Sequence, residues 1–189
     1  IKNICKSENI DFKKISPGYI SSIFDKWKNK GWYPNQVVLS KKDFFEQGIL
    51  KIYKIYQQKL LDLNVCDFGD LIMHCVHILD NNPDIRSIYS KNFKYILVDE
   101  YQDTNFIQSK WLKLLSETNK KICCVGDDDQ SIYSWRGAEI KNFLEFDKVY
   151  KNTKIIRLEE NYRSTQNILS AASGLISNND DRMGKKLWT

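Results

Sequence analysis

Short apolar runs alternate with helical stretches from residue 94 onward, and this alternation limits the fold more than any other feature. The runs are YILV at residues 95–98, ICCV at 122–125 and IIRL at 155–158. Each is short and, apart from Arg157 in the third, apolar, which is typical of a strand buried on both faces of a parallel sheet. Helical periodicity over residues 105–117, and again after a cap at Ser164, completes the alternation. The sequence therefore predicts an α/β layer.

The residues before 94 show helical periodicity instead. They predict helices over residues 18–30 and 41–64, a third from a cap at Asp67 to about residue 80, and a short fourth from Pro83. The third helix is expected to bury Leu71, Ile72, Cys75 and Ile78. The residues before 94 are therefore predicted to be all-helical and to form either a separate domain or an insertion. Residues 177–189 show no periodicity and could form a loose tail.

Composition excludes several classes of protein. The chain has 189 residues, of which 42% are hydrophobic and 28% charged, which suits a globular protein with one or two cores. No apolar run approaches the roughly 20 residues of a membrane-spanning helix, and no secretion signal opens the chain. We therefore expect a cytoplasmic protein with no membrane partner. The formal net charge of +5 allows a polyanionic partner without requiring one.

The cysteines do not predict a disulfide framework. There are five, an odd number, and no two have CxxC spacing. Cys66, His74, Cys75 and His77 lie close enough in sequence for a metal site to be conceivable. An amphipathic helix in a reducing cytoplasm would carry the same residues without a metal, and this interpretation is favoured.

The strongest chemical signal is YILVDEYQDTN at residues 95–105. A buried strand that ends in Asp99 and Glu100 presents two carboxylates at the edge where open α/β sheets bind ligands. Asp99 is placed to hold Mg²⁺ and Glu100 to polarise an attacking water, because both jobs need an ionised carboxylate near a phosphate. A surface turn before a helix would also favour carboxylates. The residues alone leave both interpretations open.

The second signal is VGDDDQSIYSWRGA at residues 125–138. Gln130 is a neutral amide that can report whether a terminal phosphate is present. Tyr133 and Trp135 offer flat faces for stacked bases, and Arg136 offers charge for a nucleic-acid backbone. A turn followed by a helix with core aromatics would explain the same spacing, and spacing alone favours that explanation.

The third signal is LEENYRS at residues 158–164. Arg163, near the start of a helix, can neutralise charge that develops on a transferred phosphoryl group. Tyr162 could stack on a purine. A Tyr–Arg pair is commonplace, so this stretch is a weak signal when taken alone.

In this order, the three stretches resemble motifs II, III and IV of the superfamily 1 DNA helicases of the UvrD/PcrA/Rep group. The segments DFGDLI at residues 67–72 and GKKLWT at 184–189 are similar to the same proteins, so the resemblance covers essentially the whole chain. It implies an ATP-dependent 3′–5′ DNA helicase that acts in repair or replication. It also implies ATP and Mg²⁺ as cofactors, and single-stranded DNA and DNA junctions as partners; protein partners are not implied.

The resemblance implies a role in ATP hydrolysis for five residues. Asp99 would coordinate Mg²⁺, Glu100 would activate the water, and Gln130 would sense the γ-phosphate. Arg163 would contact the γ-phosphate from a facing domain, and Tyr162 would stack on adenine.

A second set of implied roles concerns DNA and coupling. Tyr133, Trp135 and Arg136 would contact single-stranded DNA, with Trp135 as the main stacking residue. Gln102 would link the nucleotide site to neighbouring segments. Gln130 would couple that site to the DNA groove.

One element of the family is missing from the sequence. A phosphate cradle needs GxxxxGK[ST], and none of the eight glycines begins that pattern. We therefore expect an internal fragment that cannot hydrolyse ATP by itself. By resemblance, residues 1–92 form a helical accessory domain inserted in a RecA-like, P-loop NTPase-type motor domain with a parallel sheet. Residues 93–157 would form the second half of that motor domain, and residues 158–189 would begin a second one.

Two other classes of function remain open at this point. One is a non-catalytic module that binds single-stranded nucleic acid through the helical part and Trp135. The other is an interaction scaffold whose partner surface is the helix over residues 41–64. The intact order of the three motifs favours the enzyme over both.

Overall fold

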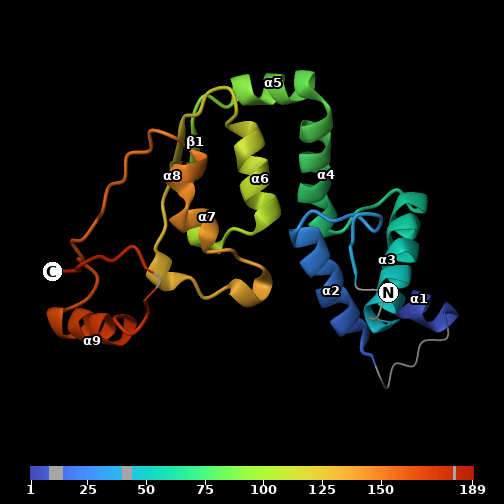
Figure 1. Ribbon diagram of the computed structural model, residues 1–189, viewed down its shortest axis with the longest axis horizontal. Coiled ribbons are helices and arrows are strands. Elements are labelled where there is room, and N and C mark those ends of the chain that lie inside the picture. The colour runs from blue at the N-terminus through green and yellow to red at the C-terminus, as the bar shows by residue number, and fades with distance from the viewer. Residues whose placement is uncertain (9–14, 40–43, 181) are drawn as a thin grey trace. The chain divides into compact units, whose positions relative to one another are not determined.

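The computed structural model describes residues 1–8, 15–39, 44–180 and 182–189, which fall into two compact units (Figure 1). One unit comprises Ile1–Ile96 and Asn105–Lys121, and the other comprises Leu97–Thr104 and Ile122–Thr189. None of the described helices combines the length and the apolar character needed to cross a bilayer. The expected domain boundaries at residues 92 and 157 stay predictions.

The first unit is helical. Its helices are α1 (Lys2–Ser7), α2 (Pro17–Asn29), α3 (Phe44–Asp62), α4 (Phe68–Asn81), α5 (Pro83–Asn92) and α6 (Phe106–Leu115). The helices predicted over residues 18–30, after Asp67 and from Pro83 are confirmed. The one predicted over residues 41–64 is confirmed from residue 44, and residues 41–43 lie outside the described part. Helices α4 and α6 pack side by side, and α5 lies across one end of both (Figure 1).

Local sequence signals explain where these helices begin. The Ser16 hydroxyl accepts a hydrogen bond from Tyr19 N at 3.1 Å, and Pro17 occupies the first helical position of α2. Helix α4 begins with a reciprocal capping box, in which Asp67 accepts from Asp70 N at 2.9 Å and Asp70 accepts from Asp67 N at 3.2 Å. These caps satisfy backbone donors that the first turn of a helix leaves free.

Aromatic and aliphatic side chains from α1, α2, α3 and the loop after α2 form a core in this unit. Its buried members are Ile4, Cys5, Ile20, Ile23, Phe24, Trp27, Val37, Ile49, Ile52 and Tyr53. The rings of Phe24 and Tyr53 lie 4.7 Å apart between their centroids, and the Tyr53 hydroxyl donates to Trp32 O at 3.1 Å. Tyr53 therefore fills the core while its polar end is satisfied.

The predicted buried face of α4 is wrong. The buried residues are Asp70, Met73, Val76 and Leu79, whereas Leu71, Cys75 and Ile78 are exposed and Ile72 is half-buried. Helix α4 is apolar on more than one face, so periodicity did not decide which face turns inward. Asp70 belongs to an ion pair inside the unit, and this turns the helix about its axis relative to the prediction.

That ion pair centres on Lys28, whose side chain is fully buried. Its Nζ lies 2.6 Å from Asp67 Oδ2 and 2.8 Å from Asp70 Oδ1. Tyr56 Oη donates to Asp67 at 3.0 Å and Gln57 Nε2 donates to Asp70 at 2.9 Å, so α2, α3 and α4 meet in one polar network. Burial raises the pKa of Asp67, but the hydrogen bonds from Lys28, Asp70 N and Tyr56 and the charge of Lys28 together outweigh it, so the pKa lies below its usual value.

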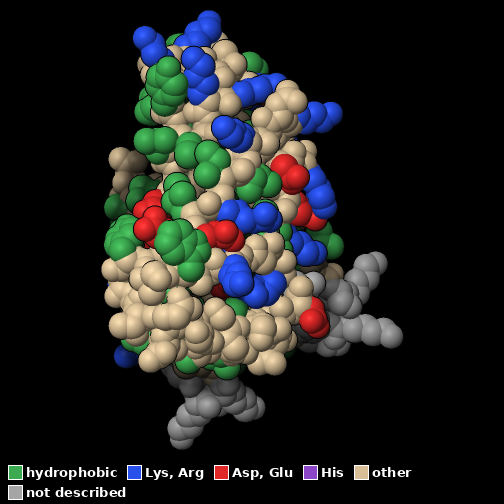
Figure 2. All heavy atoms as spheres, turned by 90° about the vertical axis from the view of Figure 1, so that its left-hand side faces the viewer, with side chains coloured by type: hydrophobic (Ala, Val, Ile, Leu, Met, Phe, Trp, Pro, Cys, Tyr) green, Lys and Arg blue, Asp and Glu red, His purple; other side chains and the backbone are tan. Residues whose placement is uncertain are grey.

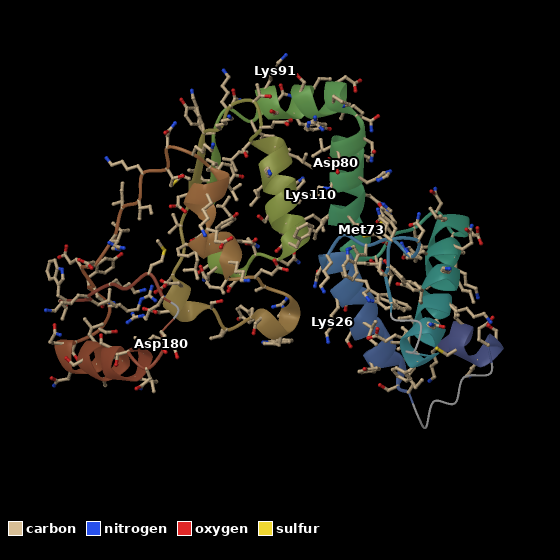
Figure 3. The ribbon with its side chains drawn as sticks, in the orientation of Figure 1. Lys26, Met73, Asp80, Lys91, Lys110 and Asp180 are labelled. Carbon is tan, nitrogen blue, oxygen red and sulfur yellow. The ribbon has the colours of Figure 1, made fainter. Side chains whose placement is uncertain are left out.

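A second ion pair joins α4 to α6 at the surface. Lys110 Nζ lies 2.6 Å from Asp80 Oδ2, and the two side chains reach toward one another between the helices (Figure 3). Both side chains are partly exposed, so water screens the pair and its contribution to stability is small. The buried pair at Lys28, by contrast, cannot lose a partner without leaving charge in the interior.

The second unit contains a short sheet. Strand β1 (Ile96–Val98) begins at the last residue of the first unit and pairs with β2 (Ile122–Cys124) in a two-stranded sheet. Val125 N donates to Val98 O at 2.8 Å and Tyr101 N donates to Val125 O at 3.0 Å, which is the pattern of parallel strands. The first two predicted strands are confirmed, but their predicted burial on both faces is wrong, since Leu97 is 81% exposed and Cys123 is exposed. The chain is a mixed α/β protein.

Short helices follow these strands. They are the 3₁₀ helices η1 (Tyr101–Asp103), η2 (Asp128–Gln130) and η3 (Ser134–Arg136), and the α-helices α7 (Lys141–Leu144), α8 (Phe146–Val149) and α9 (Gln166–Ile176). The predicted cap of the last helix at Ser164 is wrong. Thr165 is the N-cap of α9, and Ser164 N instead donates to Asn161 Oδ1 at 2.8 Å.

The third predicted strand is also wrong. Residues 155–158 adopt no regular structure, and Ile155, Ile156 and Leu158 are 53%, 69% and 80% exposed. A run rich in apolar residues becomes a strand only where a neighbouring edge can pair with it. Within the described residues this run finds no such edge, and the nearest pairing is an isolated bridge between Glu160 and Trp188.

Replacing Lys28 by methionine is expected to lower the free energy of unfolding of the first unit by about 3–5 kcal/mol, because Asp70 would keep a buried carboxylate without its cation. Chemical denaturation followed by circular dichroism measures this loss. The control is Lys26→Met on the same helix, where the side chain is exposed (Figure 3) and a change within about 0.5 kcal/mol is expected. Equal losses in the two variants would contradict the role given to the buried pair.

Candidate active site

Two adjacent carboxylates follow β1 at its carboxyl end. Asp99 and Glu100 are both exposed, and Glu100 N donates to Asp99 Oδ1 at 2.9 Å. Glu100 has a φ of 50° and a ψ of 43°, a left-handed conformation that few non-glycine residues adopt, and it is the N-cap of η1. Such backbone strain is typical of residues whose position matters to a site.

The Gln102 side chain connects this pair to the turn after β2. Gln102 is almost completely buried, with 1% of its surface exposed. Its Nε2 donates to Glu100 Oε2 at 2.7 Å, and its Oε1 accepts from Asp127 N at 3.1 Å. One amide therefore uses both of its ends to fix the backbone of one turn and the carboxylate of another.

Gly126 makes this connection possible. A Cβ at position 126 would lie 2.5 Å from Gln102 Oε1 and 2.8 Å from Phe143 Cε2. Contacts this short do not occur for real Cβ atoms, so any larger residue would push Gln102 or Phe143 aside. The glycine that ends the second apolar run is thus required for close approach and not for an unusual backbone angle.

The turn after Gly126 orients Gln130. Gln130 Nε2 donates to Asp127 Oδ2 at 2.7 Å, and Gln130 N donates to Asp127 O at 3.0 Å. Because Asp127 N is in turn bonded to Gln102, a continuous chain of contacts runs from Glu100 to Gln130. The structure thus brings these two site residues together through Gln102 and Asp127. Sequence reasoning did not assign Asp127, although an aspartate that opens a turn before η2 was a usable signal.

The carbonyl of Thr104 anchors the other end of η1. It accepts hydrogen bonds from Glu139 N at 2.9 Å and from Asn142 Nδ2 at 3.1 Å. The Tyr101 ring meets Phe146 edge to face, with 5.5 Å between the ring centroids. Helices α7 and α8 therefore hold the turn that carries Glu100, which no sequence pattern indicated.

Three residues proposed for nucleic acid lie together at η3. The rings of Tyr133 and Trp135 are 6.3 Å apart, and the Arg136 guanidinium lies 5.4 Å from the first ring and 5.8 Å from the second. Trp135 is 73% exposed, so it is not a core aromatic. Gly137, with a φ of 92°, ends the turn. The cluster presents a flat face and a positive charge to solvent.

Tyr162 and Arg163 lie apart from this network. Tyr162 is 95% exposed and Arg163 is exposed, and neither side chain makes a hydrogen bond or ion pair with a described residue. Asn161 Oδ1 accepts from Arg163 N at 3.0 Å, which fixes the backbone of the turn but leaves the guanidinium free to reach outward.

The donor chemistry at Asp99 fits a hard divalent cation. One carboxylate oxygen accepts the hydrogen bond from Glu100 N, which orients the group, and carboxylate oxygens are the ligands that Mg²⁺ prefers. The carboxylates of Asp127, Asp128 and Asp129 also lie within 4.8 Å of one another. Arg182 and Lys185 already neutralise that second group.

Comparison with known proteins identifies the class to which this architecture belongs. The sequence matches the UvrD/REP helicase N-terminal domain over residues 1–151. Because the match covers most of the chain, the protein belongs to the UvrD/REP helicase family.

Two individual relatives show how similar the chain is to known helicases. The chain is 48% identical over 190 residues to a probable DNA helicase II homolog of Rickettsia felis, and 44% identical over 189 residues to the ATP-dependent DNA helicase PcrA of Bacillus subtilis. Each alignment covers 100% of this chain, but 29% of the first relative and 26% of the second. The chain therefore spans less than a third of the length of the relatives that it matches.

Replacing Gly126 by alanine is expected to lower the free energy of unfolding of the second unit by about 1–3 kcal/mol, because the added methyl group overlaps Gln102 and Phe143. Urea denaturation measures the loss. Gly174→Ala is the matched control: nothing lies within 4 Å of its Cβ position inside α9, so the change should stabilise the helix by about 0.5–1 kcal/mol. A Gly126→Ala variant as stable as the parent would mean that Gly126 is not needed for this contact.

Proposed function

We propose that this chain supplies part of the nucleotide-binding and DNA-binding machinery of an ATP-dependent DNA helicase. The observation that carries the proposal is the chain of hydrogen bonds from Glu100 through Gln102 and Asp127 to Gln130. It joins a carboxylate suited to activating water to an amide suited to reading a phosphate. The identity to a PcrA that is named an ATP-dependent DNA helicase supports the same conclusion.

Asp99 and Glu100 would divide the chemistry of hydrolysis. Asp99 would hold Mg²⁺, which when bound neutralises charge on phosphate oxygens and favours ionised carboxylates nearby. Glu100 would accept a proton from the attacking water. Its Oε2 is occupied by the Gln102 amide, whereas Oε1 bonds to no described residue and is available for that water.

Gln130 would couple the nucleotide to DNA. Its amide lies at the end of η2, and η3 with Trp135 begins four residues later. If Gln130 moves when a terminal phosphate binds or leaves, the backbone between η2 and η3 passes the movement to the aromatic face. The contacts of Tyr133, Trp135 and Arg136 with single-stranded DNA would then change.

The remaining assignments belong to the same proposal. Arg163 and Tyr162 would complete the nucleotide site from a second motor domain, and their exposed side chains are compatible with such a contact. The motor would be RecA-like with an inserted helical domain, would move 3′ to 5′ and would act on junctions in repair or replication. The 189-residue chain itself would not turn over ATP, since it lacks a phosphate-cradle pattern.

A second function is favoured by the exposure of Trp135. A non-catalytic module that binds single strands would need the η3 cluster but not the link from Glu100 to Gln130. Catalysis that depends on Glu100 therefore separates the two proposals.

Glu100→Gln is expected to reduce ATP turnover by the complete gene product about 100-fold or more, because an amide cannot accept the proton of the attacking water. ATP binding should persist, since the hydrogen bond to Gln102 can still form. Phosphate release and nucleotide titration measure the two properties. Glu139→Gln, an exposed change in the same unit, is the control. Turnover that survives in Glu100→Gln would remove Glu100 from its proposed role.

Trp135→Ala is expected to weaken single-strand binding by about 1–3 kcal/mol, because one base loses its stacking partner. Fluorescence titration with labelled oligonucleotides measures the affinity. Trp135→Phe should retain much of it, and Phe68→Ala, which removes a 93% exposed ring from the other unit, should not affect it. An affinity unchanged by Trp135→Ala would assign DNA binding to another surface.

A further inference from the structure

Three consecutive aspartates lie in the turn between β2 and η3. The carboxylates of Asp127, Asp128 and Asp129 are within 4.8 Å of one another, and all three side chains are partly buried. Like charges this close repel strongly where water is partly excluded. Such a turn needs a compensating positive partner, and the partner determines how firmly the turn is held.

The partner is a segment more than fifty residues further along the chain, residues 182–186. Arg182 pairs with Asp129 through two parallel bonds, Nε to Oδ1 at 2.9 Å and Nη2 to Oδ2 at 2.5 Å. This bidentate geometry is the most specific that arginine can form with a carboxylate. The two side chains are only 20% and 13% exposed, so the pair is poorly screened by solvent.

The other two aspartates are bound by the same segment. Lys185 Nζ bonds to Asp127 Oδ1 and lies 3.6 Å from Asp129 Oδ2, and Met183 N donates to Asp128 Oδ2 at 2.6 Å. In Figure 2 acidic and basic side chains lie intermixed in the middle of the visible face, not in separate patches. The loose tail expected over residues 177–189 is therefore wrong for residues 182–186.

The Asp127 carboxylate accepts hydrogen bonds from both sides of this arrangement. Asp127 Oδ2 accepts the side-chain amide of Gln130, while Oδ1 accepts Lys185. Burial raises the pKa of Asp127, but the hydrogen bonds from Lys185, Gln130 and Asp129 N and the charge of Lys185 together outweigh it and leave the pKa below its usual value. The carboxylate therefore stays ionised at neutral pH and accepts both bonds together.

We propose that Arg182 and Lys185 are positioning residues for Gln130. They clamp the turn of residues 127–129 so that Asp127 holds the Gln130 amide in one orientation. Without them the long, exposed Gln130 side chain would sample many rotamers, and the turn would open under its own charge. The proposal rests on the proposed function, in which Gln130 reads the terminal phosphate.

The same arrangement suggests how the segment could influence that reading. The Gln130 amide nitrogen now donates to Asp127, so it must turn away from Asp127 before it can donate to a phosphate oxygen. Lys185 holds Asp127 through its other oxygen and so supports the bond that Asp127 makes with the amide. Movement of residues 182–186 would therefore shift the balance between the two partners of Gln130.

The test is a nuclear magnetic resonance measurement on the 189-residue chain with ¹⁵N-labelled glutamine and no nucleotide. The chain has eight glutamines, and the side-chain signal of Gln130 is assigned as the one lost in Gln130→Glu. Arg182→Gln and Lys185→Gln are each expected to move the Gln130 signal toward the position of free glutamine. The buried amide of Gln102 serves as an internal reference for an intact turn.

Two matched variants separate positioning from general stabilisation. Lys186→Gln removes a neighbouring charge whose side chain is exposed and should leave the Gln130 signal in place. Lys185→Arg retains the charge and should restore it. Where Arg182→Gln proves too unstable to record, Arg182→Lys keeps the charge but loses the bidentate pair, and a smaller shift in the same direction is expected.

A Gln130 signal that stays in place in both Arg182→Gln and Lys185→Gln would overturn the proposal. So would a shift of the Gln102 signal as large as that of Gln130, since the segment would then support the whole turn and not the one side chain. Neither result depends on ATP, so each is distinct from a failure of the proposed function, which Glu100→Gln tests through turnover.

Discussion

The buried amide of Gln102 is the contact on which the candidate site depends. It has no access to water, so both of its ends must be satisfied inside the protein, and they are satisfied by Glu100 and by the backbone of Asp127. This requirement fixes the distance between the turns that follow β1 and β2. It also explains Gly126, because no side chain fits between that backbone and Gln102. Glu100 and Gln130 are linked in space because the buried Gln102 bonds to Glu100 and to Asp127, which in turn bonds to Gln130.

The helical unit is organised by a comparable constraint. Lys28 places a full positive charge in the interior, and the carboxylates of Asp67 and Asp70 lie beside it because a buried charge needs partners of opposite sign. Buried ion pairs of this kind add less to stability than apolar packing of the same volume, but they penalise every arrangement that separates the partners. Asp70 therefore points inward although α4 offers several apolar residues for that face. In both units a polar group, and not the apolar pattern, selects one arrangement among several that would bury similar areas.

The proposed motor function follows from how these constraints are connected. Asp127 is bonded through its backbone to Gln102, through one oxygen to Gln130 and through the other to Lys185. The carboxylate proposed for hydrolysis (through Gln102), the amide proposed to read the phosphate and the basic segment of residues 182–186 are thus all linked to Asp127. A change in the bond to Gln130 or to Lys185 alters the other bond, since a carboxylate that gives up one hydrogen bond changes its charge distribution toward the rest. This is the physical basis on which binding of a nucleotide could be passed to the aromatic face at η3.

The sequence by itself determined the local elements and the residue types of the site. Continuous apolar runs indicated β1 and β2, helical periodicity located α2, and the cap at Asp67 located α4. Asp99 and Glu100 directly follow the first run, and Gln130 lies in the turn after the second. Only the tertiary structure decided the rest. The run at residues 155–158 has the pattern predicted for a strand but finds no edge to pair with among the described residues. Helix α4 buries the face that carries Asp70, because Asp70 pairs with the buried Lys28. Arg182 meets Asp129 at a separation of 53 positions in the sequence, and a pairing of that range depends on how the whole chain folds and not on the identity of neighbouring residues.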